Sequence, residues 1–235
     1  MFLSLIAVMM ILSAALPSAF AASIKFTDVK STDDGYKEIM FLAEAKILNG
    51  YKTGMFMPNQ AITRGQVAKI LTRELELEVP TDLTSFSDVP TNHRDKELVE
   101  AVAAVKDAGI FTGKKDGTFG AAEVLTRQQM AKVLTEAYDL DEYFPTHYNV
   151  VFYEDEDDIA YSLYDYVEII TGHGIAKGNA KGEFMPKRQT TRKQFSQFMY
   201  RTLAIFGKVE GYVHEVELME DAFYVTEFPT VHALD

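Results

Sequence analysis

The chain repeats one sequence pattern three times, and this repeat limits what the chain can fold into. Each copy contains Thr-Arg-x-Gln, and the arginines of successive copies lie 63 and 65 residues apart. A phenylalanine stands eight positions before each arginine, and a glycine stands fourteen positions before it. The aligned residues are Arg64, Arg127 and Arg192, then Phe56, Phe119 and Phe184, then Gly50, Gly113 and Gly178. A repeat of this length indicates one supersecondary unit that needs its neighbours to bury its apolar face.

Each copy predicts two amphipathic helices joined by a loop. Apolar residues follow each arginine at +3, +6, +7 and +11, and others precede each glycine at −11, −8 and −3, which is helical spacing. We therefore expect three helix–loop–helix units packed into one mainly α-helical body. The units span residues 24–79, 83–141 and 149–206, and a tail over residues 208–235 contains two short runs that predict strands.

The Thr-Arg-x-Gln motif combines helix capping with a cation that capping does not explain. Threonine at the N-cap and glutamine three positions later form a capping box, in which each side chain satisfies a free backbone N–H of the first turn. The arginine between them opposes the helix dipole, at a cost of a few tenths to about 1 kcal/mol at low salt. Its recurrence predicts an acidic partner. Two partners remain open: an anionic ligand at the helix start, or a carboxylate of the protein such as Asp28 or Asp88.

A second basic residue follows each aligned glycine. Lys52, Lys115 and Lys181 lie two or three positions after it, so each unit offers an arginine and a lysine. On a chain with formal charge −12, such pairs predict local binding sites for carboxylates. The aligned glycines are expected to adopt positive φ and to leave room for a ligand, and they join the candidate site. The aligned phenylalanines are expected to be core residues.

The composition argues against several classes of function. The chain has no cysteine, which excludes disulfides, thiolate nucleophiles and zinc sites built on sulfur. The five histidines share no repeat position, and the sequence contains no metal-binding pair at i, i+4 and no phosphate-binding glycine loop. The negative net charge argues against broad binding to nucleic acid or anionic lipid. We expect a non-enzymatic module without metal or cofactor.

Residues 1–21 have the character of a secretory signal peptide. They carry no charge, contain an apolar run and end in Ala19-Phe20-Ala21, a small-x-small cleavage signal. A membrane anchor is the alternative, but the apolar run is short and Pro17 interrupts it. We expect an exported protein with no membrane span after cleavage.

An aromatic-acid marker precedes the first helix of each unit. It is Phe26-Thr-Asp28-Val29 in the first unit, Phe86-Ser-Asp88-Val89 in the second and a weaker Phe152-Tyr-Glu154-Asp155 in the third. The marker is followed by a helix ending near Gly-Ile-x-x-Gly, then by Phe-x-Pro and Ile-Thr-Arg. This order resembles the S-layer homology domain over about four fifths of the chain.

The resemblance implies a fold, a partner and a location. Three tandem S-layer homology domains imply a pseudo-threefold, three-pronged spindle whose first helices form a central bundle. The family anchors surface-layer proteins or exoenzymes noncovalently to bacterial cell walls, through secondary cell-wall polysaccharide and commonly its pyruvate ketal groups. The binding arginine of its T-R-A-E motif corresponds to Arg64, Arg127 and Arg192. The chain departs from the family in having no tryptophan and in replacing the motif's Glu by Gln.

Three interpretations of function follow for this exported chain. The first is a polysaccharide anchor at the cell wall, in which arginine and lysine hold a carboxylated sugar. The second is a structural subunit of a surface layer, in which the arginines pair with acids of the protein. The third is the anchor segment of an envelope enzyme.

Overall fold

The computed structural model describes residues 24–83, 86–142 and 152–209. In these ranges the regular structure is helical, and the α-helices are α1 (Tyr36–Glu44), α2 (Arg64–Glu74), α3 (Lys96–Asp107), α4 (Arg127–Tyr138), α5 (Tyr164–Gly172) and α6 (Arg192–Ile205). Short 3₁₀ turns, Glu156–Asp158 and Tyr161–Leu163, precede α5. The predicted signal peptide and the predicted strands of the tail lie outside the described residues.

Each repeat contributes two helices, which confirms the helix–loop–helix unit. Each second helix begins at the motif arginine with its threonine at the N-cap. The glutamine Oε1 of the motif accepts the N-cap backbone N–H at 3.0, 2.9 and 3.0 Å in the three repeats. The reciprocal bond to the threonine hydroxyl is regular at Thr63 and Thr191, while the buried Thr126 Oγ1 makes no regular hydrogen bond.

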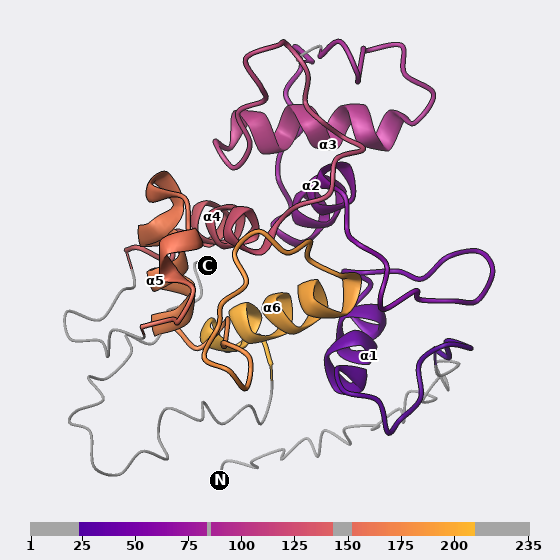
Figure 1. The fold of residues 1–235 in the computed structure, drawn as a ribbon. Coiled ribbons are helices and arrows are strands. Elements are labelled where there is room, and N and C mark those ends of the chain that lie inside the picture. Colours follow the sequence, from indigo (N-terminus) through magenta and orange to yellow (C-terminus); the bar gives the residue numbers. More distant parts are fainter. Residues whose placement is uncertain (1–23, 84–85, 143–151, 210–235) are drawn as a thin grey trace, which may run out of the picture.

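The helices pack across the repeats and not within them. The second helix of each repeat packs against the first helix of the next: α2 against α3, and α4 against α5. The last pair, α6 and α1, joins the third repeat to the first and closes a ring (Figure 1). Helices α2, α4 and α6 lie around the middle of the molecule, and α1, α3 and α5 lie outside them (Figure 1). The expectation that the first helices form the central bundle was therefore wrong.

A closed triangle of backbone hydrogen bonds links the three repeats just before the central helices begin. Ile62 N–H donates to Thr190 O at 2.9 Å, and Thr190 N–H donates to Leu125 O at 2.8 Å. Leu125 N–H donates back to Ile62 O at 3.3 Å. Each repeat therefore supplies one donor and one acceptor, so the triangle satisfies both groups of every member.

A cluster of side chains joins the other ends of the central helices. Glu74, at the end of α2, accepts a hydrogen bond from the Tyr138 hydroxyl at the end of α4. The same carboxylate forms an ion pair at 2.8 Å with Lys208, which follows α6, although the Glu74 side chain is only 4% exposed. The Tyr138 ring stacks on Phe206 with centroids 5.7 Å apart. Both ends of the central helices are thus fixed by contacts between repeats.

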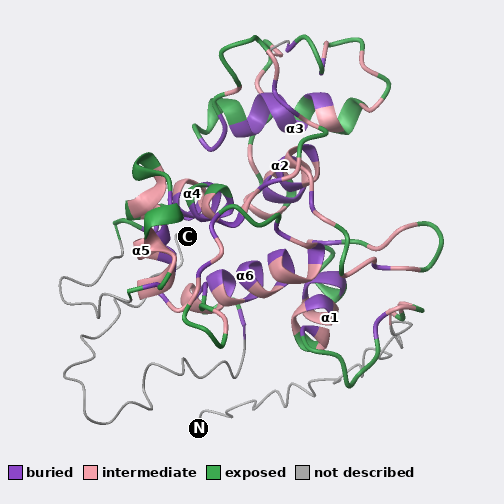
Figure 2. Cartoon of the chain, in the orientation of Figure 1, coloured by how far each residue is buried: buried purple, intermediate pink, exposed green. Residues whose placement is uncertain are grey.

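The core runs along these interfaces, and buried residues line the facing sides of the helices (Figure 2). The aligned Phe56, Phe119 and Phe184 are each 0% exposed, which confirms them as core residues. Burying a phenylalanine stabilises the fold by roughly 1.5–3 kcal/mol relative to leaving it exposed.

Candidate ligand-binding sites between the repeats

Each motif arginine reaches from its own helix into the loop of the next repeat. Arg64 Nε donates to Phe119 O at 2.8 Å, and Arg127 Nε donates to Phe184 O at 2.7 Å. Arg192 Nε closes the ring by donating to Phe56 O at 2.8 Å. The arginine therefore belongs to one repeat and its surroundings belong to another.

This geometry defines three sites, which we number by the repeat that supplies the loop. Site 1 is Arg192 with loop residues 49–56, site 2 is Arg64 with residues 112–119, and site 3 is Arg127 with residues 177–184. Each loop is a tight turn whose first residue after the aligned glycine donates its N–H to a carbonyl four positions on, at 2.8 to 2.9 Å. The three sites share one backbone design.

The arginines are held rigidly between carbonyls and aromatic rings. Arg192 Nη2 donates to Asn49 O at 2.8 Å, and Arg127 Nη2 donates to Lys177 O at 3.2 Å. Each guanidinium also lies over the phenylalanine ring of its loop, at 4.6 to 4.8 Å from the centroid. A cation over a ring face is stabilised by the ring quadrupole, and the carbonyls satisfy its donors. Hydrogen bonds and rings together compensate for burying the charge.

Burial differs among the three arginines. Arg127 and Arg192 are 4% and 3% exposed, whereas Arg64 is only partly buried, and its side chain donates one hydrogen bond to the described residues, from Nε. Burial lowers the pKa of all three guanidinium groups. Because the ordinary pKa of arginine lies above 12, each remains charged at neutral pH.

The sequence left open whether these arginines pair with acids of the protein. Among the described residues they form no ion pair, and their protein partners are carbonyls and rings. Asp28 and Asp88, the candidate partners, instead bind backbone N–H groups. Asp28 accepts from Phe56 and Met57 at 2.7 and 2.8 Å.

The marker acid of each repeat holds the loop that receives the arginine. Asp88 accepts the N–H groups of the three residues from Phe119 onward, at 2.7 to 2.9 Å. Burial alone would raise the pKa of Asp88, but these donors outweigh it and lower that pKa. Asp155 makes the same pair of bonds, to Phe184 and Met185, both at 2.7 Å. The acids thus shape the sites without neutralising the arginines by direct contact.

The aromatic-acid marker of the third repeat lies one residue later in the structure than the sequence pattern predicts. Asp155, and not Glu154, fills the place of Asp28 and Asp88. The aromatic residue of the marker is Tyr153, which is 7% exposed and packs 5.2 Å from Phe184, while Phe152 is 75% exposed. The third copy is therefore less degenerate than its sequence indicates.

The candidate lysines lie at the tips of the three loops. Lys52, Lys115 and Lys181 are all exposed, and none forms an ion pair with the described residues. The arginine that contacts the loop of each lysine comes from the preceding repeat around the ring. The expected pairing within one repeat was therefore wrong: Lys52 shares site 1 with Arg192, Lys115 shares site 2 with Arg64, and Lys181 shares site 3 with Arg127.

The aligned glycines are needed for close packing within the repeat. A Cβ on Gly50 or on Gly113 would lie 2.4 Å from the marker ring of Phe26 or Phe86, and one on Gly178 would lie 2.9 Å from Tyr153. Positive φ, expected at all three, occurs only at Gly113. The positions that require it in every loop come four residues later, at Gly54, Gly117 and Gly182, where φ is +78, +80 and +76.

A residue four positions before each motif arginine also belongs to the sites, and the sequence analysis missed it. We call it the rim residue: it is Gln60 at site 1, Glu123 at site 2 and Arg188 at site 3. Its backbone carbonyl accepts the N–H of the visiting arginine at 2.8 to 2.9 Å. The clue in the sequence was its constant spacing, but its identity changes from copy to copy.

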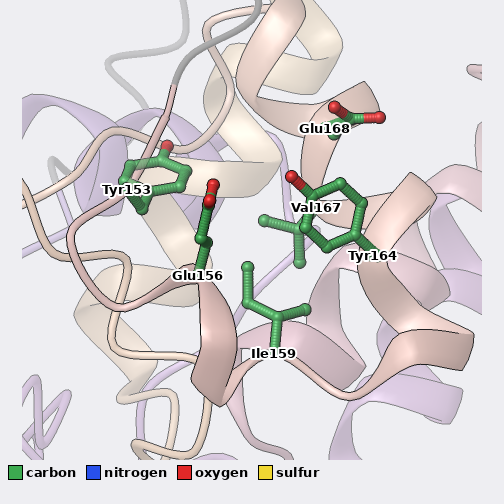
Figure 3. A pocket seen from close by; sticks show the side chains of 6 residues that line it. All are labelled: Tyr153, Glu156, Ile159, Tyr164, Val167 and Glu168. Carbon is green, nitrogen blue, oxygen red and sulfur yellow. The ribbon is translucent and has the colours of Figure 1, made fainter.

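A small hollow lies among residues of the third repeat. It has room for about one water molecule, about 10 Å³, and is lined by Tyr153, Glu156, Ile159, Tyr164, Val167 and Glu168 (Figure 3). Burial, then the neighbouring Asp165 and Glu156, raise the pKa of Glu168. With carboxylates in its lining, this hollow does not suit an anionic ligand.

Two further observations concern chemistry and membranes. Across the described ranges, histidine and acidic side chains do not gather into the groups of three or more that hold a metal ion. None of the helices in those ranges combines the length and apolar character that crossing a bilayer requires.

Comparison with known proteins places the chain in a family. The family model for the S-layer homology domain matches residues 25–68, 85–131 and 153–196. The chain is 34% identical over 170 residues to an endoglucanase of Bacillus sp. (strain KSM-635), which covers 72% of this chain and 18% of that protein. It is 30% identical over 198 residues to the surface-layer 125 kDa protein of Lysinibacillus sphaericus, covering 83% and 16%. The chain thus spans less than a fifth of the length of these relatives. It belongs to the S-layer homology domain family.

Proposed function

We propose that this S-layer homology chain anchors an exported protein to the bacterial cell wall by binding a carboxylated wall polysaccharide. The observation that carries the proposal is the threefold arrangement itself: in three equivalent places, a motif arginine contacts a loop of the neighbouring repeat, and that loop carries an exposed lysine. Such pairs suit the carboxylate of a pyruvylated sugar.

The arginine and the lysine contribute differently to binding. The guanidinium is fixed by carbonyls and a ring, so a ligand does not have to order it. The lysine lies on an exposed turn and offers a point charge on a long, flexible side chain. Sites of this kind are weak singly. Three of them on one rigid ring increase the affinity for a repeating polymer through effective concentration.

The test is binding of the purified chain to cell-wall sacculi, before and after removal of the wall polysaccharide and of its pyruvate. We expect binding to intact walls and loss of binding after either treatment. Binding that survives both treatments would contradict the proposal.

A matched pair of variants tests the sites without disturbing the core. In the first, Lys52, Lys115 and Lys181 are changed to Gln; in the control, the exposed Lys25, Lys30 and Lys46 are changed to Gln. Both remove three charges. We expect the first variant to lose at least about tenfold in affinity, which is about 1.4 kcal/mol, and the control to change little. Equal loss in both variants would show that only overall charge matters.

Two cargoes fit the anchor, and the relatives favour both. Most of this chain matches a small part of the surface-layer 125 kDa protein, and most of it likewise matches a small part of the endoglucanase. A surface-layer cargo predicts assembly into ordered sheets on walls, visible by electron microscopy. An enzyme cargo predicts a catalytic activity that sediments with cell walls. In the variant that lacks the three loop lysines, this activity is expected to stay in the supernatant.

A further inference from the structure

The three sites share one geometry but carry different charges at the rim. The rim residue is neutral at site 1 (Gln60), negative at site 2 (Glu123) and positive at site 3 (Arg188). In every case it lies beside the visiting arginine, because its carbonyl accepts that arginine's backbone N–H at 2.8, 2.8 and 2.9 Å for sites 1, 2 and 3. The same structural position is therefore neutral in one repeat, negative in another and positive in the third.

At site 2, the rim residue neutralises the site from within. Glu123 Oε1 forms an ion pair with Lys114 Nζ at 2.5 Å. Burial lowers the pKa of Arg64, and Glu123 is the strongest charge acting in the opposite direction. The protein thus places one of its own carboxylates at the rim of site 2, where it pairs with Lys114 and acts on the charge of Arg64.

At site 1, the rim residue supplies no charge. Gln60 Oε1 accepts a hydrogen bond from the Tyr51 hydroxyl at 3.1 Å. Tyr51 lies under Arg192, with 4.9 Å between the guanidinium carbon and the ring centroid. Site 1 therefore keeps the charge of its arginine and Lys52 alone.

At site 3, guanidinium groups converge. Arg188 is exposed, and its only side-chain contact with the described residues is from Nη1 to Met185 Sδ at 3.5 Å, a weak acceptor. Arg201 of α6 donates to Ile175 O at 2.9 Å, two residues from the Lys177 O that accepts Arg127 Nη2. No ion pair with an acid is formed by these three arginines within the described ranges.

Electrostatics distinguishes site 3 in the same way. Burial lowers the pKa of Arg127, and Tyr153 opposes this most strongly. The cations Arg188 and Arg201 then lower the pKa further, and Asp155 opposes them least. At the other two sites the neighbouring groups raise the pKa of the arginine and oppose burial. One acid, Glu183, belongs to the loop of site 3, but its carboxylate is held by Asn179 Nδ2 at 2.7 Å.

We infer that site 3 is the principal anion-binding site of the ring, where Arg188 and Arg127 hold a sugar carboxylate between two guanidinium groups. Site 2 is weakened by its own Glu123, and site 1 is intermediate. This inference rests on the proposed function, because it assigns the wall polysaccharide's carboxylate mainly to one of the three sites. Two guanidinium groups on one carboxylate give charge-assisted hydrogen bonds of high strength.

The test removes one rim charge at a time in the full chain. The test variant, Arg188→Gln, gives site 3 the same rim residue as site 1. The control variant, Lys187→Gln, removes one positive charge from the neighbouring position. Lys187 forms only an exposed ion pair with Asp158, and such a pair contributes little to stability. Binding to purified pyruvylated wall polysaccharide is measured by calorimetry, with the depyruvylated polymer in parallel. We expect Arg188→Gln to weaken binding about tenfold. Lys187→Gln is expected to change it less than about twofold.

The second arm changes the opposite charge. Glu123→Gln removes the negative charge that acts on Lys114 and Arg64 and leaves Lys114 its longer contact with Asp116 at 3.9 Å, so binding is expected to become about threefold tighter. Arg188→Lys keeps the charge and is expected to retain part of the affinity, while thermal unfolding of every variant confirms an intact fold. Equal affinities for Arg188→Gln and Lys187→Gln would overturn the inference. Failure of the unmodified chain to bind the pyruvylated polymer would instead overturn the proposed function.

Discussion

The base and the rim of the three sites differ in how closely the repeats agree. The base consists of the motif arginine, the phenylalanine beneath it and the carbonyls it contacts, and its Nε–carbonyl distances are 2.7 to 2.8 Å in all three copies. The rim consists of the rim residue and the loop lysine. At the rim, glutamine, glutamate and arginine replace one another on the same backbone. The base is shared because it joins one repeat to the next, and the rim is free to set charge.

This difference changes how the recurring arginine is understood. A cation in the first helical turn pointed to an anionic ligand or to an acid of the protein. In the structure, the first partner of each arginine is a carbonyl of the next repeat, so the residue joins repeats whether or not a ligand is bound. Ligand binding, as proposed, uses a group that the fold already requires.

The largest expected effect comes from removing the base of site 3. Phe184→Ala leaves a cavity under Arg127 and is expected to lower the free energy of unfolding by about 3–5 kcal/mol. Phe152→Ala, at a phenylalanine that is 75% exposed, is the matched control and is expected to change it by less than about 0.5 kcal/mol. Urea unfolding followed by circular dichroism measures both. Similar losses of unfolding free energy in the Phe184→Ala and Phe152→Ala variants would mean that Phe184 does not help to join the repeats.

A smaller effect separates two arginines of the same motif. Arg192→Met strands two carbonyls, Phe56 O and Asn49 O, and is expected to lower the free energy of unfolding by about 3 kcal/mol. Arg64→Met strands only Phe119 O at a partly exposed position, so about 1 kcal/mol is expected. Denaturant titration of the two variants compares them directly. An equal loss of unfolding free energy at Arg64 and Arg192 would show that the contribution of the motif arginine does not depend on its burial.

A further small effect depends on pH and concerns the acid that shapes site 2. Backbone donors hold the pKa of Asp88 below its ordinary value, so its carboxylate stabilises the fold above the unfolded-state pKa. That stabilisation is lost as pH falls through the lower, folded-state pKa. At pH 7, Asp88→Asn is expected to cost about 1–2 kcal/mol, and the difference from the unmodified chain should shrink on acidification toward pH 2. A difference that stays constant over this range would refute the carboxylate's role.

The local parts of the fold could be predicted from the sequence because their signals are local. Helical periodicity and the Thr-x-x-Gln spacing determine where the second helices begin, and the structure begins them at Arg64, Arg127 and Arg192. The aligned phenylalanines also fell in the core, as their spacing indicated.

The connections between repeats could not be predicted in the same way. The three loops have the same pattern, so spacing alone does not say which loop receives which arginine, and the pairing follows from tertiary packing. The predicted register of the third marker was wrong for a related reason. Phe152 and Tyr153 are both aromatic, and only the space beside Gly178 selects Tyr153. The rim escaped notice because a position that changes from Gln to Glu to Arg shows no pattern.

The pairing of α6 with α1 has a consequence for the order in which the molecule can form. The first helix of the three repeats, Tyr36–Glu44, packs against their last, Arg192–Ile205, and Arg192 Nη2 reaches back across 143 positions to Asn49. A chain that emerges from its amino end therefore holds the first helix without its packing partner until the third repeat has been synthesised. The ring of three repeats thus cannot close before its third repeat is present, however early the first two have formed their own contacts.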